Sequence, residues 1–222
     1  MITIKEGDFI EIEYTGRIKN NNKVFDTTLE NVAKKEGIHS KGATYGSRII
    51  CIGNYHILKG LDDNLKGKEI GKEYTFDIDM KDAFGKKNAK LIKTVPSSLF
   101  KKQKMNPFPG LQINADGMMG VVRSVAGGRV LVDFNHPLAG RELVYYVNVI
   151  KKVDDEKEQI SSILMVELGL KKDMYSLEYK DGAVEIKTKI KIPDEIQKVF
   201  ADRVKKLVKG LKKLSIVEEK KK

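Results

Sequence analysis

The chain alternates between a hydrophobic pattern typical of half-buried strands and one typical of helices. Apolar and polar residues alternate along FIEIEYTGRI (9–18) and GKEYTFDIDM (71–80), and RIICIG (48–53) also has strand character. Alternation with a period of two indicates strands with one buried face. Between them, the apolar residues of 57–65 recur at helical spacing, and Gly67 is placed to stop the helix in a left-handed conformation. A short helix packed on an antiparallel sheet predicts an α+β fold.

The pattern changes at Lys86, where the chain becomes basic and rich in turn residues. Strands are expected at 91–95, 111–114, 118–125 and 129–134, which predicts a small β unit. The run ELVYYVNVIKKV (142–153) then returns to a β-branched and aromatic composition. We interpret it as the final strand of the first domain, resumed after an insertion. The predicted domains are therefore 1–85 plus 135–153, with an inserted domain at 86–134.

Residues 154–222 form a third predicted unit. A helix is expected over 154–170, and two strands flank the turn KDG (180–182) as a hairpin. A second helix is expected over 193–214, with Pro193 and acidic residues at its start. This predicts a C-terminal domain made of a helix, a β-hairpin and a helix. The second helix has one apolar stripe, composed of Ile196, Val199, Phe200, Val204, Leu207, Val208 and Leu211.

Composition limits the classes of protein to consider. With 222 residues, 41% of them hydrophobic, the chain can bury real cores, and it has no apolar run of about 18 residues. The N-terminus lacks the basic and apolar regions of a signal peptide, so we expect a cytoplasmic protein with no membrane partner. Cys51 is the only cysteine, and His39, His56 and His136 are far apart. No disulfide, metal site or cofactor is expected.

The net charge of +11 is concentrated in two segments. Residues 86–134 contain nine Lys and Arg against two Asp and Glu, and residues 193–222 contain ten against five. Such segments attract nucleic acid or acidic partners. Neither segment interleaves aromatic residues with its lysines in a stacking pattern, so specific nucleic-acid binding is not expected.

Six motifs resemble those of FKBP-type peptidyl-prolyl cis/trans isomerases, within the SlyD-like branch that has a domain inserted in the flap. No single motif is decisive, but together they cover most of residues 1–153 in the family's order. The C-terminal extension resembles that of long archaeal members. The motifs are IEYTG (12–16), VFDTT (24–28), ILKGLDDNLKGKEIGKEY (57–74), DAFG (82–85), VPSSLF (95–100) and NHPLAGRELVYYVNV (135–149).

The resemblance implies a proline-binding pocket and the role of each residue in it. Its members would be Tyr14, Phe25 and Asp26 on one side, Ile57 and Leu58 at a rim whose backbone holds a substrate carbonyl, Leu61 at the floor, Phe84 on the flap and Tyr145 at the far wall. Two positions depart from the common pattern. Leu61 replaces a frequent tryptophan, which implies a roomier pocket. Phe84 replaces a frequent tyrosine and lacks its hydroxyl, which makes macrolide binding doubtful.

The chemistry of these residues suits prolyl isomerisation. The amide loses resonance as it twists, and a water-poor aromatic pocket favours that twisted state by differential binding. Neither a nucleophile nor a metal is required. A catalytically weak binding module or chaperone on the same scaffold is the alternative interpretation.

The inserted domain of SlyD-like members binds unfolded chains, which implies proline-containing unfolded or partly folded polypeptides as partners. Some apolar residues of the insert must form its own core, while flexible methionines suit an adaptable groove. For the C-terminal domain, the open interpretations are a stabilising appendage, a homodimer formed through the apolar stripe, and a contact with nucleic acid. The candidate client-binding residues are Leu99, Phe100, Met105, Phe108, Met118 and Met119.

Overall fold

The computed structural model describes residues 2–180 and 182–219. The chain forms two compact units, one made of Met1–Ile78 with Leu143–Lys222 and the other of Asp79–Glu142. The second unit encloses the segment expected to be an insert. The first unit contains the expected C-terminal domain and most of the expected first domain, whose residues 79–85 and 135–142 belong to the second unit.

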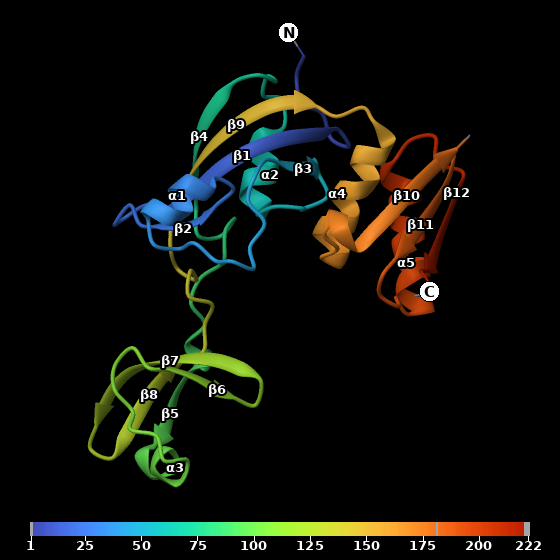
Figure 1. Cartoon of the computed structure of the whole chain (residues 1–222). Coiled ribbons are helices and arrows are strands. Elements are labelled where there is room, and N and C mark those ends of the chain that lie inside the picture. The colour runs from blue at the N-terminus through green and yellow to red at the C-terminus, as the bar shows by residue number, and fades with distance from the viewer. Residues whose placement is uncertain (1, 181, 220–222) are drawn as a thin grey trace. The chain divides into compact units, whose positions relative to one another are not determined.

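The first unit is built on a five-stranded antiparallel sheet (Figure 1). Its strands are β1 (Phe9–Ile18), β2 (Val24–Thr27), β3 (Arg48–Cys51), β4 (Glu73–Ile78) and β9 (Leu143–Lys152). The order is β2-β1-β9-β4, and β3 also pairs with β1. Helix α1 (Glu30–Lys35) follows β2, and helix α2 (Lys59–Leu65) packs against β4. The predicted α+β class is confirmed.

Alternation of buried and exposed residues fixes the face that the sheet turns to its core. On β9, Leu143, Tyr145, Val147 and Val149 are buried, while the residues between them are more exposed. Because successive side chains of a strand point to opposite faces, one face of β9 is buried in the core and the other is more exposed.

Helix α2 ends as its glycine predicts. Leu61 and Leu65 are buried, and Gly67 has a φ of +77° just beyond the helix C-cap residue Lys66. Glycine adopts this left-handed conformation without the steric cost that a side chain would add.

The C-terminal part of the chain forms a three-stranded sheet with two helices. Its elements are α4 (Glu156–Leu168), the 3-10 turn η2 (Lys172–Met174), β10 (Tyr175–Lys180), β11 (Ala183–Thr188), α5 (Asp194–Leu207) and β12 (Lys213–Glu218). The predicted helices and hairpin are present, although Asp181 of the predicted turn lies outside the described residues. The Asp155 side chain caps α4 by accepting a hydrogen bond from the Glu158 amide at 2.8 Å.

One prediction for this region is wrong. The helix expected to reach residue 214 ends at Leu207, and residues 213–218 form β12, which pairs in parallel with β11. Gly210 has a φ of +93°, which turns the chain out of the helix, and the β-branched residues of LSIV suit the strand. The domain is therefore a helix, a hairpin, a helix and a further strand.

The apolar stripe of α5 is largely used inside the protein. Phe200, Val204, Val208 and Leu211 are buried in a core with residues of α4 and the hairpin, whereas Ile196 and Val199 remain exposed. Most of the surface proposed for a homodimer is thus already covered. A dimer through this helix stays a prediction, with Ile196 and Val199 as its remaining apolar contacts.

The same core connects the C-terminal elements to the five-stranded sheet. Phe9, Cys51 and Val153 are buried together with Ile160 and Ile163 of α4, and Ile49 packs against this cluster from β3. A continuous apolar core across these elements explains why they form one compact unit.

The second unit is a four-stranded antiparallel sheet with its own small core. It contains the 3-10 turn η1 (Ala89–Leu91), β5 (Ile92–Pro96), α3 (Ser97–Lys102), β6 (Gln112–Ala115), β7 (Met118–Ala126) and β8 (Arg129–Asp133), with strand order β5-β8-β7-β6. All four strands lie within two residues of their predicted bounds, whereas α3 was not expected. The core consists of Phe100, Ile113, Val122, Val130 and Val132.

Phe100 requires a correction, because it was assigned to the client-binding surface. Its side chain is 3% exposed and lies in the core of the second unit, and Met105 packs partly against that core. A short helix turns Phe100 inward while the neighbouring Leu99 stays 48% exposed. Phe108, Met118 and Met119 are exposed as well.

A buried carboxylate, Asp133 at the end of β8, ties this strand to β7 and to the segments that precede β5 and follow β8. It accepts hydrogen bonds from Lys87 at 2.7 Å, from Arg123 at 2.9 Å and from the backbone and side-chain nitrogens of Asn135. Burial alone would raise the pKa of Asp133, but the hydrogen bonds from Lys87, Asn135 and Arg123 outweigh it and hold the pKa far below its usual range. Asp133 therefore remains charged.

We predict that Asp133→Asn destabilises the second unit by about 1–3 kcal/mol, because an amide cannot accept this set of hydrogen bonds from charged donors. Amide hydrogen exchange of β7 and β8 measures the loss. Since the folded pKa is depressed, the contribution of Asp133 is present above its unfolded pKa of about 3.9 and is lost as the pH falls further. The exposed Asp116, changed to Asn, is the matched control. Equal exchange in both variants would contradict this role.

Candidate active site

Three aromatic rings meet on the buried face of the sheet, around a glycine. The ring centroids of Tyr14 on β1 and Tyr145 on β9 lie 5.7 Å apart, and Phe25 on β2 meets Tyr145 edge-on at the same distance. Gly16 pairs with both Tyr145 and Asp26 in the sheet. A Cβ atom at Gly16 would lie 2.7 Å from the Phe25 ring and 3.0 Å from the Tyr145 ring. The rings can pack here only because Gly16 has no side chain.

One polar contact orients this cluster. The Tyr14 hydroxyl donates a hydrogen bond to the Asp26 carboxylate at 2.8 Å, and the Arg48 guanidinium lies 5.9 Å from the centroid of the Tyr14 ring. Burial, followed by the charge of Asp26, raises the pKa of Tyr14, although Arg48 opposes the shift. Burial likewise raises the pKa of Tyr145. Both phenols therefore keep their protons at neutral pH.

Strand β2, which carries Phe25 and Asp26, is fastened to β1 by threonines. The Thr28 hydroxyl accepts a hydrogen bond from the Tyr14 amide at 2.9 Å, and the Thr27 hydroxyl donates to the Tyr14 carbonyl at 3.0 Å. Thr27 and Thr28 are both buried. These bonds hold Asp26 in register with Gly16, within reach of the Tyr14 hydroxyl.

The predicted rim residues lie at the start of α2. Leu58 is the N-cap residue, and its carbonyl accepts hydrogen bonds from the amides of Leu61 and Asp62. Among the described residues, the backbone N–H groups of Ile57 and Leu58 have no protein acceptor. Both side chains are partly exposed, whereas Leu61 is buried. Free donors at a helix start can bind a carbonyl oxygen.

The turn before this rim is held by a buried carboxylate. Asp62 is fully buried and accepts hydrogen bonds from the amides of Gly53 and Tyr55 at 3.0 and 3.1 Å. Tyr55 has a positive φ of 55°, a conformation that non-glycine residues adopt rarely. The backbone leading to the rim is thus fixed by α2 itself.

Phe84, the predicted flap residue, belongs to the second unit. Its ring stacks on His136 with a centroid distance of 4.3 Å. The His136 Nδ1 atom accepts a hydrogen bond from the Leu138 amide, so His136 stabilises the turn in NHPLAG. Tyr14, Phe25, Asp26 and Tyr145 are brought together by direct contacts, while Phe84 remains a site residue by resemblance.

Sequence reasoning missed four residues of this site: Gly16, Thr27, Thr28 and Arg48. Gly16, Thr27 and Thr28 lie inside the motifs IEYTG and VFDTT, so their positions in those motifs were a usable signal. Nothing in the strand RIICIG marks Arg48 as a neighbour of Tyr14, because the contact depends on the pairing of β3 with β1.

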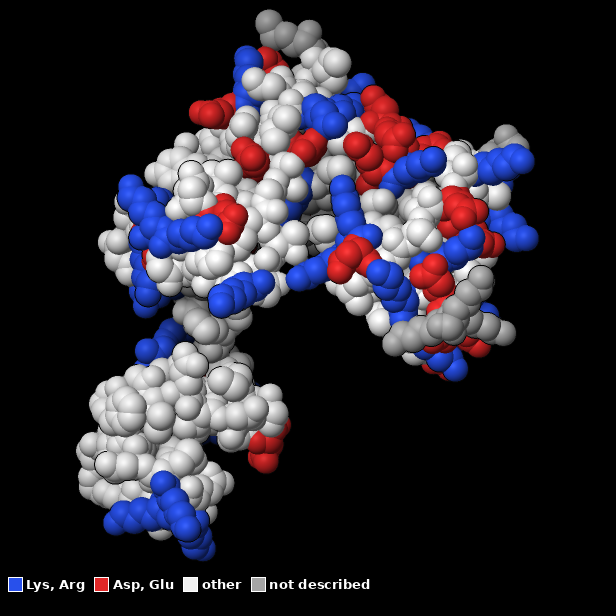
Figure 2. Space-filling model, viewed as in Figure 1, with Lys and Arg blue, Asp and Glu red and all other residues white. Residues whose placement is uncertain are grey.

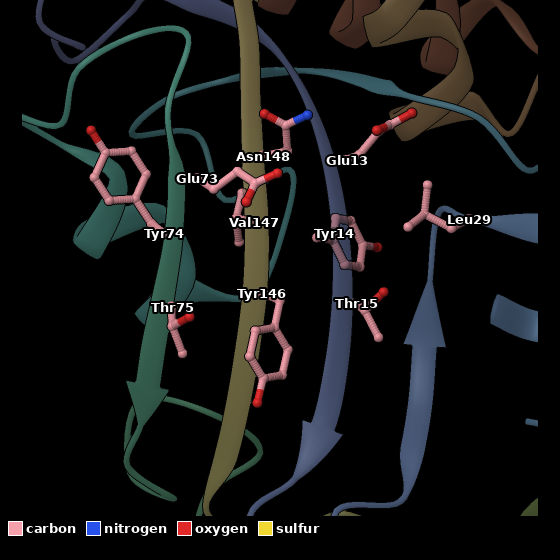
Figure 3. Close-up of a pocket in the computed structure, with 10 residues that line it drawn as sticks. All are labelled: Glu13, Tyr14, Thr15, Leu29, Glu73, Tyr74, Thr75, Tyr146, Val147 and Asn148. Atoms are coloured by element: carbon pink, nitrogen blue, oxygen red, sulfur yellow. The ribbon is translucent and has the colours of Figure 1, made fainter.

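An open hollow of about 450 Å³ lies on the other face of the sheet (Figure 3). Tyr146, which is 47% exposed between the buried Tyr145 and Val147, lines it together with Glu13 and Glu73. Because neighbouring strand residues point to opposite faces, Tyr146 points away from the ring of Tyr145, although Tyr14 of the aromatic cluster also lines the hollow.

Two kinds of feature are absent from residues 2–180 and 182–219. No group of three or more His, Cys, Asp and Glu side chains there is arranged to hold a metal ion. No helix in that part of the chain is long and apolar enough to cross a membrane.

Two family models and several known proteins are similar to parts of this chain. The family model described as FKBP-type peptidyl-prolyl cis-trans isomerase matches residues 2–101, and the model of the FKBP26 IF domain matches residues 93–138. SlyD isomerases from Vibrio cholerae and Pasteurella multocida are 34% and 31% identical to the chain over 44% and 49% of its length. The chain spans 50% and 56% of those two proteins.

A shorter relative is covered almost completely. The short-type peptidyl-prolyl cis-trans isomerase of Methanocaldococcus jannaschii is 32% identical over 146 residues, which is 66% of this chain and 92% of that protein. The chain belongs to the FKBP-type peptidyl-prolyl cis-trans isomerase family.

Proposed function

We propose that the cluster of Tyr14, Phe25 and Tyr145 is the pocket in which this peptidyl-prolyl isomerase rotates X-Pro bonds, and that its second unit binds unfolded clients. The observation that supports the pocket most is the packing of Phe25 and Tyr145 over Gly16, beside the Tyr14 to Asp26 hydrogen bond. It combines an apolar aromatic surface with one oriented polar group.

The physical requirement is to favour a twisted amide over a planar one. Rotation of a peptide bond faces a barrier of about 18–20 kcal/mol because resonance is lost as the bond twists. An X-Pro bond has a weaker preference for trans, but its rotation is still slow. A pocket that excludes water and binds the twisted state more tightly than the planar states lowers this barrier.

Each residue has a distinct part in the proposed mechanism. The aromatic rings hold the proline ring of the substrate. The free N–H groups of Ile57 and Leu58 bind a substrate carbonyl group next to the proline, on either side of it in the chain. Asp26 orients Tyr14 and transfers no proton. Leu61 forms the floor, and Phe84 contributes an aromatic surface without a hydroxyl, as the resemblance implies.

The client-binding surface that we propose consists of the exposed apolar residues of the second unit. Leu99, Phe108, Met118 and Met119 are between 41% and 58% exposed. Lys101, Lys102 and Lys104 lie near Leu99 in the chain, and much of the visible surface of this unit is uncharged (Figure 2). Exposed apolar residues of this number on a small unit are typical of interaction surfaces. The neighbouring lysines suit clients with acidic residues.

We expect Phe25→Ala and Tyr145→Ala each to lower kcat/KM on a proline tetrapeptide by about tenfold or more, since a loss of roughly 1.4 kcal/mol in transition-state binding slows a reaction tenfold. A protease-coupled assay measures the rate, and circular dichroism confirms that the fold is retained. Tyr146→Ala, on the opposite face, is the control. Parental rates in both pocket variants would exclude this pocket.

Gly16→Ala tests the same pocket without removing an aromatic ring. The added methyl group would collide with Phe25 and Tyr145, so we expect the rings to move and kcat/KM to fall by about tenfold. Gly42→Ala is the matched control, because a Cβ there meets only the Ser40 side chain at 3.9 Å. If both alanine variants keep the parental rate, the close packing over Gly16 is not required for activity.

The proposed client-binding surface can be tested separately from the pocket. The double change Met118→Ser and Met119→Ser should lower catalysis of a proline-limited refolding reaction by about tenfold, because apolar client contacts are lost. Tetrapeptide turnover should remain unchanged. Val199→Ser, which removes an exposed apolar side chain from α5, controls for a general change of surface. An equal loss of both activities would contradict a separate client site.

A further inference from the structure

A buried histidine precedes the proposed rim directly. The His56 side chain is only 3% exposed, and its Nδ1 atom accepts a hydrogen bond from the Cys51 amide at 3.1 Å. Cys51 ends β3, so this bond closes the turn that runs from the sheet to Ile57 and Leu58. The position of the His56 ring is therefore coupled to the backbone that enters the rim.

The other side of the ring faces the C-terminal part of the chain. The His56 Nε2 atom lies 3.5 Å from the Glu167 carboxylate on α4 and has no hydrogen-bond partner among the described residues. Glu167 in turn accepts a hydrogen bond from the Arg203 Nε atom on α5 at 3.1 Å. Arg203, Glu167 and His56 thus form a polar series from α5 to the turn before the rim.

Apolar packing holds these elements together. Phe9 and Cys51 of the sheet share a buried core with Ile160, Ile163 and Leu164 of α4. Because interiors are close-packed, α4 cannot shift freely against β3. The Glu167 carboxylate is consequently presented to His56 from a fixed support.

We propose that Glu167 is a positioning residue for the isomerase pocket, holding the His56 ring and thereby the backbone of Ile57 and Leu58. The C-terminal helices would then tune the isomerisation rate through the rim. This inference rests on the proposed function of that rim.

The protonation state of His56 follows from its contacts. Because Nδ1 accepts a hydrogen bond from an amide, it carries no proton in the neutral ring, and Nε2–H faces Glu167. Burial lowers the pKa of His56 from its usual value. Arg203 on α5 adds to this shift, whereas the charges of Glu167 and of Asp62 on α2 oppose it. Protonation of Nδ1 would place two N–H groups, those of His56 and Cys51, opposite each other. The hydrogen bond between them would be lost and the turn would open.

The test compares Glu167→Ala and Glu167→Gln in the full chain with Glu158→Gln. Glu158 is an exposed residue of the same helix whose carboxylate lies near Lys151, so it controls for the loss of one charge. We expect Glu167→Ala to lower kcat/KM on a proline tetrapeptide by about tenfold, below the hundredfold that a misplacement of about 1 Å can cost. Glu167→Gln, whose amide oxygen still accepts a hydrogen bond, should restore part of the rate.

Nuclear magnetic resonance gives readouts that do not depend on activity. Both Glu167 variants should shift the amide signals of Ile57 and Leu58, and should lower the pKa of His56 because a negative neighbour is lost. Glu158→Gln should do neither. Amide signals and a His56 titration that match those of the parent protein in both Glu167 variants would overturn the inference, and so would an unchanged kcat/KM.

Two further outcomes are distinguishable. If the parent protein does not turn over the tetrapeptide, the proposed function fails, and the amide signals and the His56 titration still decide whether Glu167 positions the rim. If thermal denaturation shows that Glu167→Ala is unfolded, the isosteric Glu167→Gln decides by the same signals.

Discussion

The antiparallel pairing of β1 with β9 is the interaction on which the rest of the structure depends. These strands are separated by more than 120 residues, yet they lie side by side along nearly their whole lengths (Figure 1). The pairing sets Gly16 opposite Tyr145 and Tyr14 opposite Val147, which creates the aromatic cluster. It also requires the chain to return after the second unit. Within that unit, the Gly140 amide donates a hydrogen bond to the Gly85 carbonyl at 2.7 Å, which brings together the two ends of the unit.

This order of pairing has a consequence for folding. The contacts of the second unit span only residues 79–142, whereas the sheet of the first unit closes only when β9 has been made. Folding is slow where a long loop must close before distant strands can pair. The inserted sheet can therefore form before the proposed pocket exists. If the second unit forms first, the client-binding candidates on it would be folded before the proposed catalytic site is assembled.

Most of the fold could be predicted from hydrophobic periodicity because its strands have one buried face. The long strands β1 and β9 and the four strands of the inserted sheet follow this rule. Strand β12 was missed because its pairing with β11 is parallel and not local, and because Leu207, Leu211 and Leu214 continue a helical spacing. Phe100 was assigned wrongly to the surface because the sequence pattern of an apolar residue among lysines is the same whether its side chain points inward or outward.

The candidate site was predictable only through its motifs, and its supporting residues show why. Tyr14, Phe25, Asp26 and Tyr145 belong to motifs that could be matched, whereas Arg48 and Glu167 act across strands and helices that the sequence does not place together. The pocket itself changes little with pH near neutrality, since both phenols have raised pKa values and keep their protons. His56, by contrast, lies next to the rim while facing the C-terminal helices, and burial lowers its pKa from the usual histidine value. Any acid sensitivity of the isomerase should therefore enter through the support of the rim, where the two parts of the first unit meet, and not through the aromatic rings of the proposed pocket.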